Sequence, residues 1–241
     1  MINDYMKNVV VFDLETTGCN PVLDSIIEIG AIKIENGKAV DKYHQMLNPK
    51  ESIPSFITEI TGITNDMVKD GLTIEEALPS FLDFCDGDYV LGHNVSFDYR
   101  FIKAKSIKEG YGFSKKAIDT LAIARRFLKH LPSRSLAPLC QYYGIDLTNA
   151  HRAIHDAEAT FQLFKCLKRD FFHIDESLFK ARDMVWNPPK QDMITERQKR
   201  YLISLIKTHK IEIDKDIEGL TKSEASRMID NILTQYRCRF I

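Results

Sequence analysis

Near the N-terminus, one short run of residues joins a hydrophobic strand to a pair of acids, and it reads Val9-Val10-Val11-Phe12-Asp13-Leu14-Glu15-Thr16-Thr17-Gly18. Its first half is β-branched and aromatic without charge, which is typical of a strand buried on both faces. Side chains alternate along a strand, so Asp13 and Glu15 share one face and Leu14 points to the other. Two adjacent carboxylates need protons or cations to neutralise them, and their oxygens suit Mg2+ or Mn2+. The pair alone is equally compatible with an exposed strand end carrying two solvated acids.

Length and composition indicate a globular protein. The chain has 241 residues, of which 44% are hydrophobic and 28% are charged, enough for one well-filled domain and an appendage. It contains no apolar run of the roughly 18 residues that a membrane span needs, and its start lacks the pattern of a signal peptide. We therefore expect a cytoplasmic protein with no membrane partner.

Charge and cysteine content narrow the classes of function. Lys and Arg number 33 against 34 Asp and Glu, so the net charge of -1 gives no sign of a globally basic nucleic-acid binder, and any such binding has to be local. The five cysteines are scattered and form no C-x-x-C pair, which favours reduced thiols over disulfides or a zinc site. They are Cys19, Cys85, Cys140, Cys166 and Cys238.

The pattern of the chain predicts a meander followed by mixed helices and strands. Residues 26–34 and 42–47 resemble strands, and Asn36-Gly37 between them is a strong hairpin signal. Further strands are predicted at 89–91 and 117–119. Helices are predicted at 55–59, 65–69, 74–85, 95–109 with Asn94 as its cap, after Asp119 as a cap, at 135–143 before Gly144, and from about 151 to 172.

Two of these helices carry polar residues that could serve chemistry. Asp98 falls in the first turn of the helix after Asn94, where an acid usually only complements the helix dipole. At about 100° per residue, His151 and Asp156 would point about 140° apart on one helix, so they converge only if His151 precedes the first turn. His155 is the competing histidine, and the spacing leaves both open.

Three segments in this order resemble the motifs of the DEDDh exonuclease family. They are Phe12 to Gly18 (Phe-Asp-Leu-Glu-Thr-Thr-Gly), His93 to Asp98 (His-Asn-x-x-Phe-Asp) and His151 to Asp156 (His-x-x-x-x-Asp). The family includes the proofreading epsilon subunit of bacterial DNA polymerase III and the exonuclease domain of the Gram-positive replicative polymerase. The resemblance extends over roughly residues 7–172, and three ordered motifs are far more specific than one.

The resemblance implies an α/β, RNase H-like fold, with a mixed five-stranded sheet flanked by helices and an active site at the end of the first strand. It further implies hydrolysis of a nucleic acid from its 3′ end, with release of nucleoside 5′-monophosphates. His151 would be the general base, and His155 occupies a position that the family does not use. The residues implied to hold two divalent cations, Mg2+ or Mn2+, are Asp13, Glu15, Asp98 and Asp156.

The same resemblance implies a set of substrate contacts. Thr16, with the backbone after Glu15, would contact the terminal sugar hydroxyl, and Leu14 and Thr17 would also bind substrate. Ile60 or Ile63 would wedge against the terminal base, although packing in the core is an equally good account of both isoleucines. Asn94 would contact substrate or only cap its helix.

Three functions follow as hypotheses. The first is a 3′-5′ exonuclease acting on DNA, preferably single-stranded 3′ ends, alone or as the editing partner of a DNA polymerase. The second is the same chemistry on RNA, and the motifs do not separate the two because discrimination of the 2′-hydroxyl depends on pocket shape. The third is a nucleic-acid-binding module without catalysis, against which the complete set of four acids and a histidine argues.

The chain beyond the resemblance reads as a linker and a small module. We place the exonuclease domain at 1–172, a linker at 173–192 around Pro188-Pro189, and a helix-loop-helix module at 193–241. Capping boxes at Thr195 to Gln198 and Thr221 to Glu224 open its two helices. The first helix carries Arg197, Lys199, Arg200, Lys207 and Lys210. We expect the module to guide substrate or a partner, with a merely solvated basic face as the alternative.

Overall fold

The computed structural model describes residues 8–87, 89–147, 150–212 and 216–237, and its central feature is a mixed sheet. The strands lie in the order β3-β2-β1-β4-β5-β6. Strands β1 to β3 form the predicted antiparallel meander, β4 and β5 follow in parallel, and β6 is antiparallel to β5. The bounds are β1 Asn8–Thr16, β2 Ile26–Glu35, β3 Lys38–Met46, β4 Tyr89–Gly92, β5 Lys116–Asp119 and β6 Arg182–Asp183.

Within the described residues the sheet therefore has six strands, where five were expected. The additional strand, β6, comprises two residues that pair with Lys116 and Ala117 of β5. A strand of this length contains no alternation of apolar and polar residues, so the sequence pattern could not reveal it.

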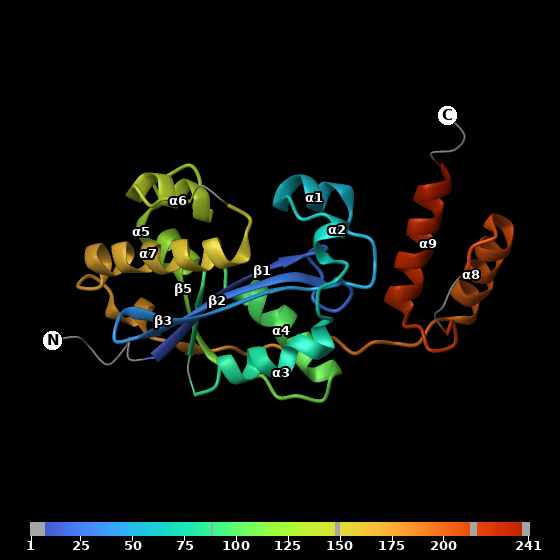
Figure 1. The fold of residues 1–241 in the computed structure, drawn as a ribbon, viewed down its shortest axis with the longest axis horizontal. Helices are drawn as coiled ribbons and strands as arrows, with labels where there is room; N and C mark the ends of the chain where they lie inside the picture. The colour runs from blue at the N-terminus through green and yellow to red at the C-terminus, as the bar shows by residue number, and fades with distance from the viewer. Residues whose placement is uncertain (1–7, 88, 148–149, 213–215, 238–241) are drawn as a thin grey trace. The chain divides into compact units, whose positions relative to one another are not determined.

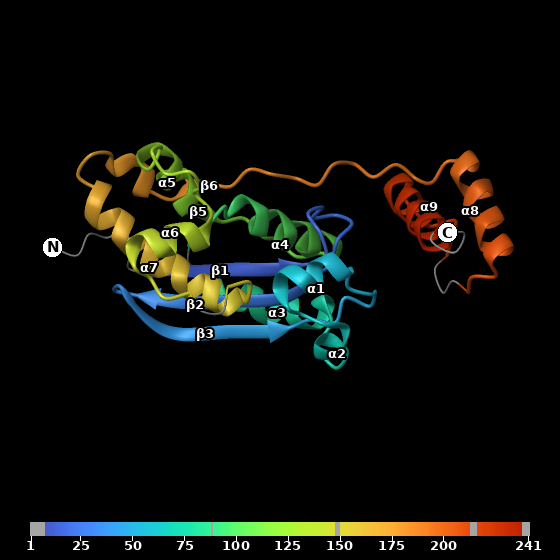
Figure 2. The same cartoon turned by 90° about the horizontal axis from the view of Figure 1, so that it is seen from above.

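Helices cover both faces of the sheet, as Figures 1 and 2 show. On one face lie α5 (Thr120–Phe127), α6 (Leu136–Tyr143) and α7 (Ala153–Phe171), and on the other lie α3 (Ile74–Phe84) and α4 (Ser96–Lys108). Residues Val9 and Val11 of β1 pack in the cluster with α7, whereas Val10, Phe12 and Leu14 pack in the cluster with α3 and α4. This alternation places Asp13 and Glu15 on the same face of β1, as predicted, and the structure shows that this is the face covered by α7.

Short helices complete the domain beside the sheet. They are α1 (Ser55–Thr61) and α2 (Asn65–Val68), which share a small core with Ile27 of β2. Both match the helical pieces predicted for these segments.

Most local signals in the sequence hold. Asn36 and Gly37 adopt positive φ angles of 50° and 79° in the hairpin, as a primed turn requires. Asp119 caps α5 by accepting a hydrogen bond from the N–H of Leu121, and Gly144 ends α6 with φ 65°. Both are the roles predicted for these residues.

The predicted role of Asn94 as a helix cap is wrong. Residue Val95 stands at the N-cap of α4 without a side-chain capping bond, and Asn94 precedes it with a φ angle of 65°. The backbone N–H of Asn94 instead donates a hydrogen bond to Asp119 Oδ1 at 2.9 Å. A contact from the end of β5, far away in sequence, thus shapes the turn that leads into α4.

The chain divides into two compact units, Met1–Asn187 and Pro188–Ile241. The linker predicted to begin at residue 173 therefore begins later. The 3-10 helix η2 (Glu176–Phe179) buries Phe179 in the first unit, and Tyr99 Oη donates a hydrogen bond to the carbonyl of Met184 at 3.0 Å. Residues up to Asn187 thus belong to the first unit.

The second unit has its own small core. Its helices α8 (Glu196–His209) and α9 (Lys222–Arg237) begin at the two predicted capping boxes. The residues buried between them are Leu202, Leu205, Leu220, Ile229 and Ile232.

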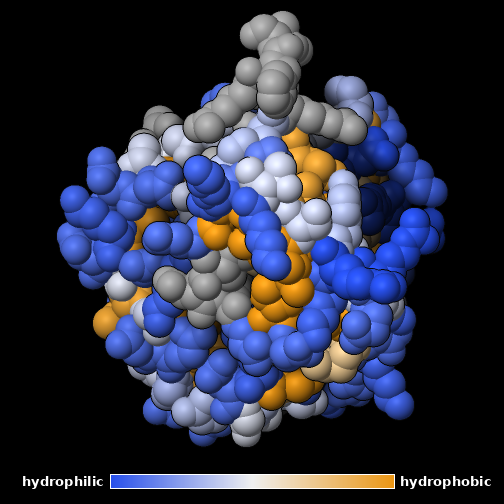
Figure 3. Space-filling view, turned by 90° about the vertical axis from the view of Figure 1, so that its right-hand side faces the viewer, coloured by the Kyte–Doolittle hydropathy of each residue, from blue (hydrophilic) through white to orange (hydrophobic). Residues whose placement is uncertain are grey.

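The surface and the thiols complete the description. The face of the molecule shown in Figure 3 is mostly hydrophilic, with small hydrophobic areas. Among the described residues, Cys19, Cys85, Cys140 and Cys166 form no disulfide, and Cys238 lies outside the described residues. Within the described ranges, every helix is too short or too polar to cross a membrane.

Candidate active site

The four predicted acids, which come from three separate segments, meet in one cleft of about 690 Å³. Asp13 and Glu15 come from β1, Asp98 from the first turn of α4, and Asp156 from the first turn of α7. Asp98 Oδ1 accepts a hydrogen bond from the backbone N–H of Leu14 at 3.1 Å, which ties α4 to β1 inside the cleft. The fold thus brings together residues separated by up to 143 positions.

His151 lies beside these acids because it is outside the helix. Helix α7 has Arg152 as its N-cap, and His151 precedes it with a φ angle of 63°. Its backbone N–H donates to Asp156 Oδ2 at 3.1 Å, so the condition stated from helix geometry is met. A ring nitrogen of His151 and carboxylate oxygens of Glu15 and Asp156 lie within 4.8 Å of one another.

His155 faces a different hollow. It lines a second cavity of about 600 Å³, between the β2–β3 hairpin and α7, together with Lys42 and Glu158. The structure therefore places His151 at the acids and His155 in a separate cavity, whereas the sequence spacing left the choice between the two open.

Electrostatics make the cleft unfavourable for negative charge. Burial raises the pKa of Glu15 to about 8, and the charges of Asp156 and Glu28 add to the effect. Burial, followed by repulsion from Asp98 and Asp156, also raises the pKa of Asp13 well above its usual range. The pKa of Asp98 is raised mainly by burial, although the N–H of Leu14 opposes the shift. These carboxyls ionise readily only when positive charge is added nearby.

The residues fit a divalent cation. Burial raises the pKa of Asp156, and its Oδ2 accepts the N–H of His151, whereas its buried Oδ1 has no hydrogen-bond partner in the described part of the chain. An unpaired buried carboxylate oxygen is costly, and a metal ion would satisfy it. Glu15, His151 and Asp156 are close enough to share one ion.

Of the predicted substrate residues, some line this cleft and some do not. Leu14 and Asn94 do. Thr16 and Thr17 are buried at the end of β1, where Thr16 Oγ1 donates to the carbonyl of Gly18 at 2.6 Å and Thr17 Oγ1 accepts the N–H of Ser25 at 2.9 Å. Their hydroxyls stabilise the turn after β1.

The two isoleucines have different environments. Ile60, on α1, is 54% exposed, whereas Ile63 is fully buried beside Ile27, Ile53 and Val68. Ile63 is thus a core residue, and Ile60 is the one of the two that can reach a ligand.

Sequence reasoning missed the wall of the cleft formed by the α5–α6 region. Arg125 and Arg134 line it, and His93 Nε2 donates to the carbonyl of Arg134 at 3.0 Å. Burial lowers the pKa of His93, which favours the neutral ring at this position. The basic residues between 125 and 134 are visible in the sequence, but their distance along the chain from the acids hid their place in the cleft.

Comparison with known proteins identifies the domain. A family model described as Exonuclease matches residues 10–164, which include every acid of the cleft and His151. The chain belongs to this exonuclease family. Residues 10–164 therefore lie within an exonuclease domain, as the resemblance implied.

Curated relatives are much longer proteins. DNA polymerase III PolC-type from Caldanaerobacter subterraneus subsp. tengcongensis is 45% identical over 155 residues, covering 64% of this chain and 11% of the relative. The protein of the same name from Thermotoga maritima is 44% identical over 156 residues, with the same shares. The chain thus spans about a tenth of the length of these relatives.

Solved structures share the fold. The nuclease domain of 3′hExo, a DEDDh family member bound to rAMP, has a TM-score of 0.62 at 19% identity, covering 77% of this chain and 100% of that one. Exonuclease X in complex with 5′ overhanging duplex DNA has a TM-score of 0.57 at 23% identity, covering 70% and 96%. E. coli Exonuclease I with a dA16 oligonucleotide has a TM-score of 0.63 at 21% identity, covering 72% and 42%. The α/β architecture is that of these exonucleases.

Proposed function

We propose that this exonuclease domain removes nucleoside 5′-monophosphates from DNA 3′ ends by metal-dependent hydrolysis. The observation that carries the proposal is the convergence of four acids and His151 in one cleft of an exonuclease domain. A module that only bound nucleic acid would not need this costly set of buried carboxyls.

Each acid of the cleft and His151 has a role in this proposal. Asp13, Glu15, Asp98 and Asp156 hold two divalent cations, Mg2+ or Mn2+, which supply activation of water and stabilisation of the leaving 3′-oxygen. His151 accepts the proton of the attacking water, for which it is exposed at the cleft and within reach of Glu15. The hydrogen bond from the backbone N–H of His151 to Asp156 holds this residue next to the acids.

Other residues, some of which line the cleft, would bind the strand. The guanidinium groups of Arg125 and Arg134, which line the cleft, bind backbone phosphates, since Arg matches phosphate geometry. Leu14 and Asn94 contact the terminal nucleotide, and exposed Ile60 packs against its base. Thr16 and Thr17 shape the turn that presents the backbone to the terminal sugar.

DNA is the favoured substrate, and a DNA polymerase is the proposed partner. Relatives at 45% and 44% identity are DNA polymerases, and two of the structural neighbours were solved with DNA, which supports an editing role in bacterial replication and a cytoplasmic location. The neighbour bound to rAMP supports an exoribonuclease as the second candidate.

One assay separates these candidates. The purified full chain, with Mg2+ or Mn2+, is given 5′-labelled single-stranded DNA, duplex DNA with a mismatched 3′ end, and RNA of the same sequence. We expect stepwise shortening of the DNA from its 3′ end, lost with chelator and in Asp13→Ala. Metal-independent shortening by the pure protein would contradict the mechanism. Faster shortening of RNA than of DNA would make RNA the substrate in place of DNA.

We further propose that the second unit binds nucleic acid through the outer face of α8. Arg197, Arg200 and Lys207 are exposed on this face, and Tyr201, which is 46% exposed, is beside them. Lys199, in contrast, bonds to Glu218 within the unit. Exposed cations with an interleaved aromatic ring suit a single strand, because phosphates pair with the cations and bases stack on the ring.

Charge removal tests the α8 face. The triple variant Arg197→Ala, Arg200→Ala, Lys207→Ala should weaken binding of long single-stranded DNA and reduce the salt dependence of log K by about 2, since each phosphate contact contributes about 0.7. Arg227→Ala on α9 is the control for loss of one charge. Equal affinity and an unchanged salt slope in the triple variant would contradict the proposal and leave protein docking as the role of the unit.

A further inference from the structure

A buried carboxylate outside the metal-binding set lies next to the cleft. Glu28 of β2 is 0% exposed and pairs with Glu15 across the β1–β2 ladder, on the same face of the sheet. A buried ionised carboxylate is tolerated only when donors surround it.

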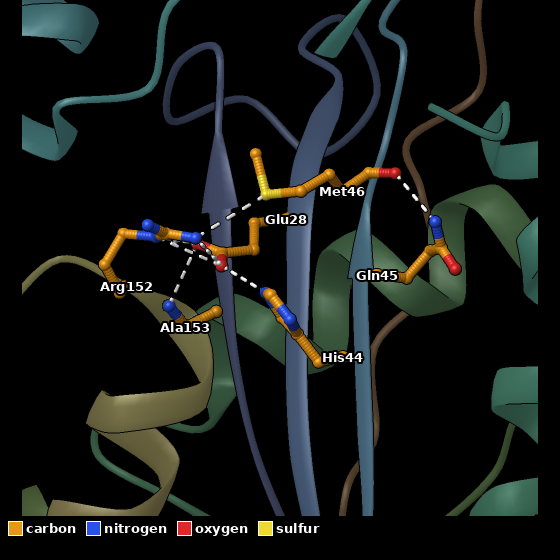
Figure 4. Close-up of polar contacts among 6 residues, drawn as sticks. All are labelled: Glu28, His44, Gln45, Met46, Arg152 and Ala153. Atoms are coloured by element: carbon orange, nitrogen blue, oxygen red, sulfur yellow. Dashed lines mark hydrogen bonds and ion pairs between the residues drawn. The ribbon is translucent and has the colours of Figure 1, made fainter. Parts of the chain in front are cut away.

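Donors from two other segments surround Glu28, as Figure 4 shows. Arg152 donates from Nε to both carboxylate oxygens at 3.2 and 3.3 Å and from Nη2 to Oε1 at 3.1 Å. His44 Nε2 of β3 lies 2.6 Å from Oε1, and the backbone N–H of Ala153 donates to Oε2 at 3.1 Å. The carboxylate thus ties β3 and the start of α7 to β2.

These donors sit at the point where α7 begins. Arg152 is the N-cap of α7 and makes no capping bond with its own side chain. The first N–H groups of a helix lack intrahelical partners, and Glu28 satisfies that of Ala153 from a neighbouring strand. Gly30 lets the same strand approach closely, because a Cβ there would lie 2.1 Å from the backbone N of Ile154.

The residue immediately before Arg152 is His151. Its backbone has a φ angle of 63°, a conformation that a non-glycine residue keeps only when neighbouring contacts hold it. The backbone N–H of His151 donates a hydrogen bond to Asp156. The residues that follow His151, Arg152 and Ala153, are held by their hydrogen bonds to Glu28.

We propose that Glu28 is a positioning residue for His151. By fixing Arg152 and the first turn of α7 on β2, it sets the place of the His151 ring beside Glu15 and Asp156. Glu28 itself contacts neither substrate nor metal in this role. The inference rests on the proposed function for its kinetic consequence, but not for its structural one.

The test compares two contacts that the sheet makes with the segment of Arg152 and α7, one from β2 and one from β3. Glu28→Gln keeps the shape of the side chain and weakens its hydrogen bonds with Arg152. Arg152→Lys keeps the positive charge and removes the forked geometry of the guanidinium group. Lys42→Ala is the matched control. It removes the exposed ion pair between Lys42 of β3 and Glu158 of α7, which lies away from the start of the helix. All three variants are first compared by thermal unfolding.

Kinetics with a single-stranded DNA oligonucleotide and Mg2+ give the first readout. We expect Glu28→Gln to lower kcat about 10- to 100-fold with little change in KM, as loss of an orienting partner does. Lys42→Ala should retain kcat. In a His151→Ala background the Glu28→Gln loss should largely vanish, because residues that act through one group are not additive.

Histidine NMR of the metal-free protein gives a readout independent of activity. The ring resonances of His151 should move in Glu28→Gln and in Arg152→Lys and stay in place in Lys42→Ala. Unmoved resonances, or an equal loss of kcat with and without His151, would overturn the positioning role. If the native chain shortens no nucleic acid, the proposed function fails, and the resonances still decide the role of Glu28.

Discussion

At the scale of single residues, the acids of the cleft link the stability of the fold to pH and, under the proposed function, to metal binding. The pKa of Glu15 has its ordinary value of 4.5 in the unfolded chain. In the fold, burial disfavours the charged form and raises this pKa to about 8. Below the lower value both states hold the proton. As the pH rises between the two values, only the unfolded state loses the proton, so the free energy of unfolding falls.

We therefore expect the metal-free protein to lose stability from about pH 5 to pH 8, and added Mg2+ or Mn2+ to restore more of it at the upper end. Melting temperatures in chelator and in metal, at both pH values, measure this. Glu15→Gln removes the titrating group and is the control. The same pH slope in Glu15→Gln as in the native chain would show that other groups cause it.

The two histidines of the third motif give a second prediction at this scale. His151 lies at the acids and His155 lines the separate hollow with Lys42. His151→Ala should lower kcat about 10²- to 10⁴-fold, the usual contribution of a general base, and His155→Ala should keep most activity. Single-turnover rates on a DNA oligonucleotide measure both. The reverse order of the two variants would place the base on His155.

At the scale of elements, the site depends on how closely α7 approaches the sheet. A Cβ on Gly30 of β2 would lie 2.1 Å from the backbone N of Ile154 and 2.2 Å from the carbonyl carbon of Ala153. These are backbone atoms, which cannot rotate away as a side chain can. A small residue at this point of β2 lets the first turn of α7, with Asp156, reach β1.

Gly30→Ala should therefore lower the free energy of unfolding by about 1–3 kcal/mol, the usual cost of overpacking. It should also lower kcat, since the start of α7 has to shift. Gly112→Ala is the control, because its Cβ would have nothing within 4 Å. Urea unfolding of the three proteins measures the effect, and equal midpoints would contradict the close approach.

At the scale of the molecule, the boundary between the two units can be tested by truncation. Phe179 is 1% exposed in the first unit, and β6 and Met184 bond to β5 and Tyr99. A chain ending at Asn187 should keep the melting temperature and the activity on short oligonucleotides. A chain ending at Phe172, the boundary expected from sequence, should be destabilised by several kcal/mol because it loses the buried Phe179. Equal melting temperatures would return the boundary to residue 172.

The sequence by itself determined the features that depend on neighbouring residues. The period-2 pattern of β1 placed Asp13 and Glu15 on one face, and turn and cap residues such as Gly37, Asp119 and Gly144 set where elements begin and end. The three ordered motifs led to the family, since each motif keeps its own spacing. Such signals are local, so they survive without knowledge of the fold.

Tertiary structure alone decided which distant groups meet. It separated His151 from His155, exposed Ile60 and buried Ile63, and brought Arg125 and Arg134 into the cleft that holds the acids. It also replaced Asn94 as a cap, added β6 to the sheet, and surrounded the carboxylate of Glu28 with donors from β3 and α7. These outcomes depend on packing between segments that are far apart in the chain. An unpaired buried charge or donor is costly, and this cost favours one arrangement over another. Because the cost arises only when the segments come together, local sequence signals do not contain it.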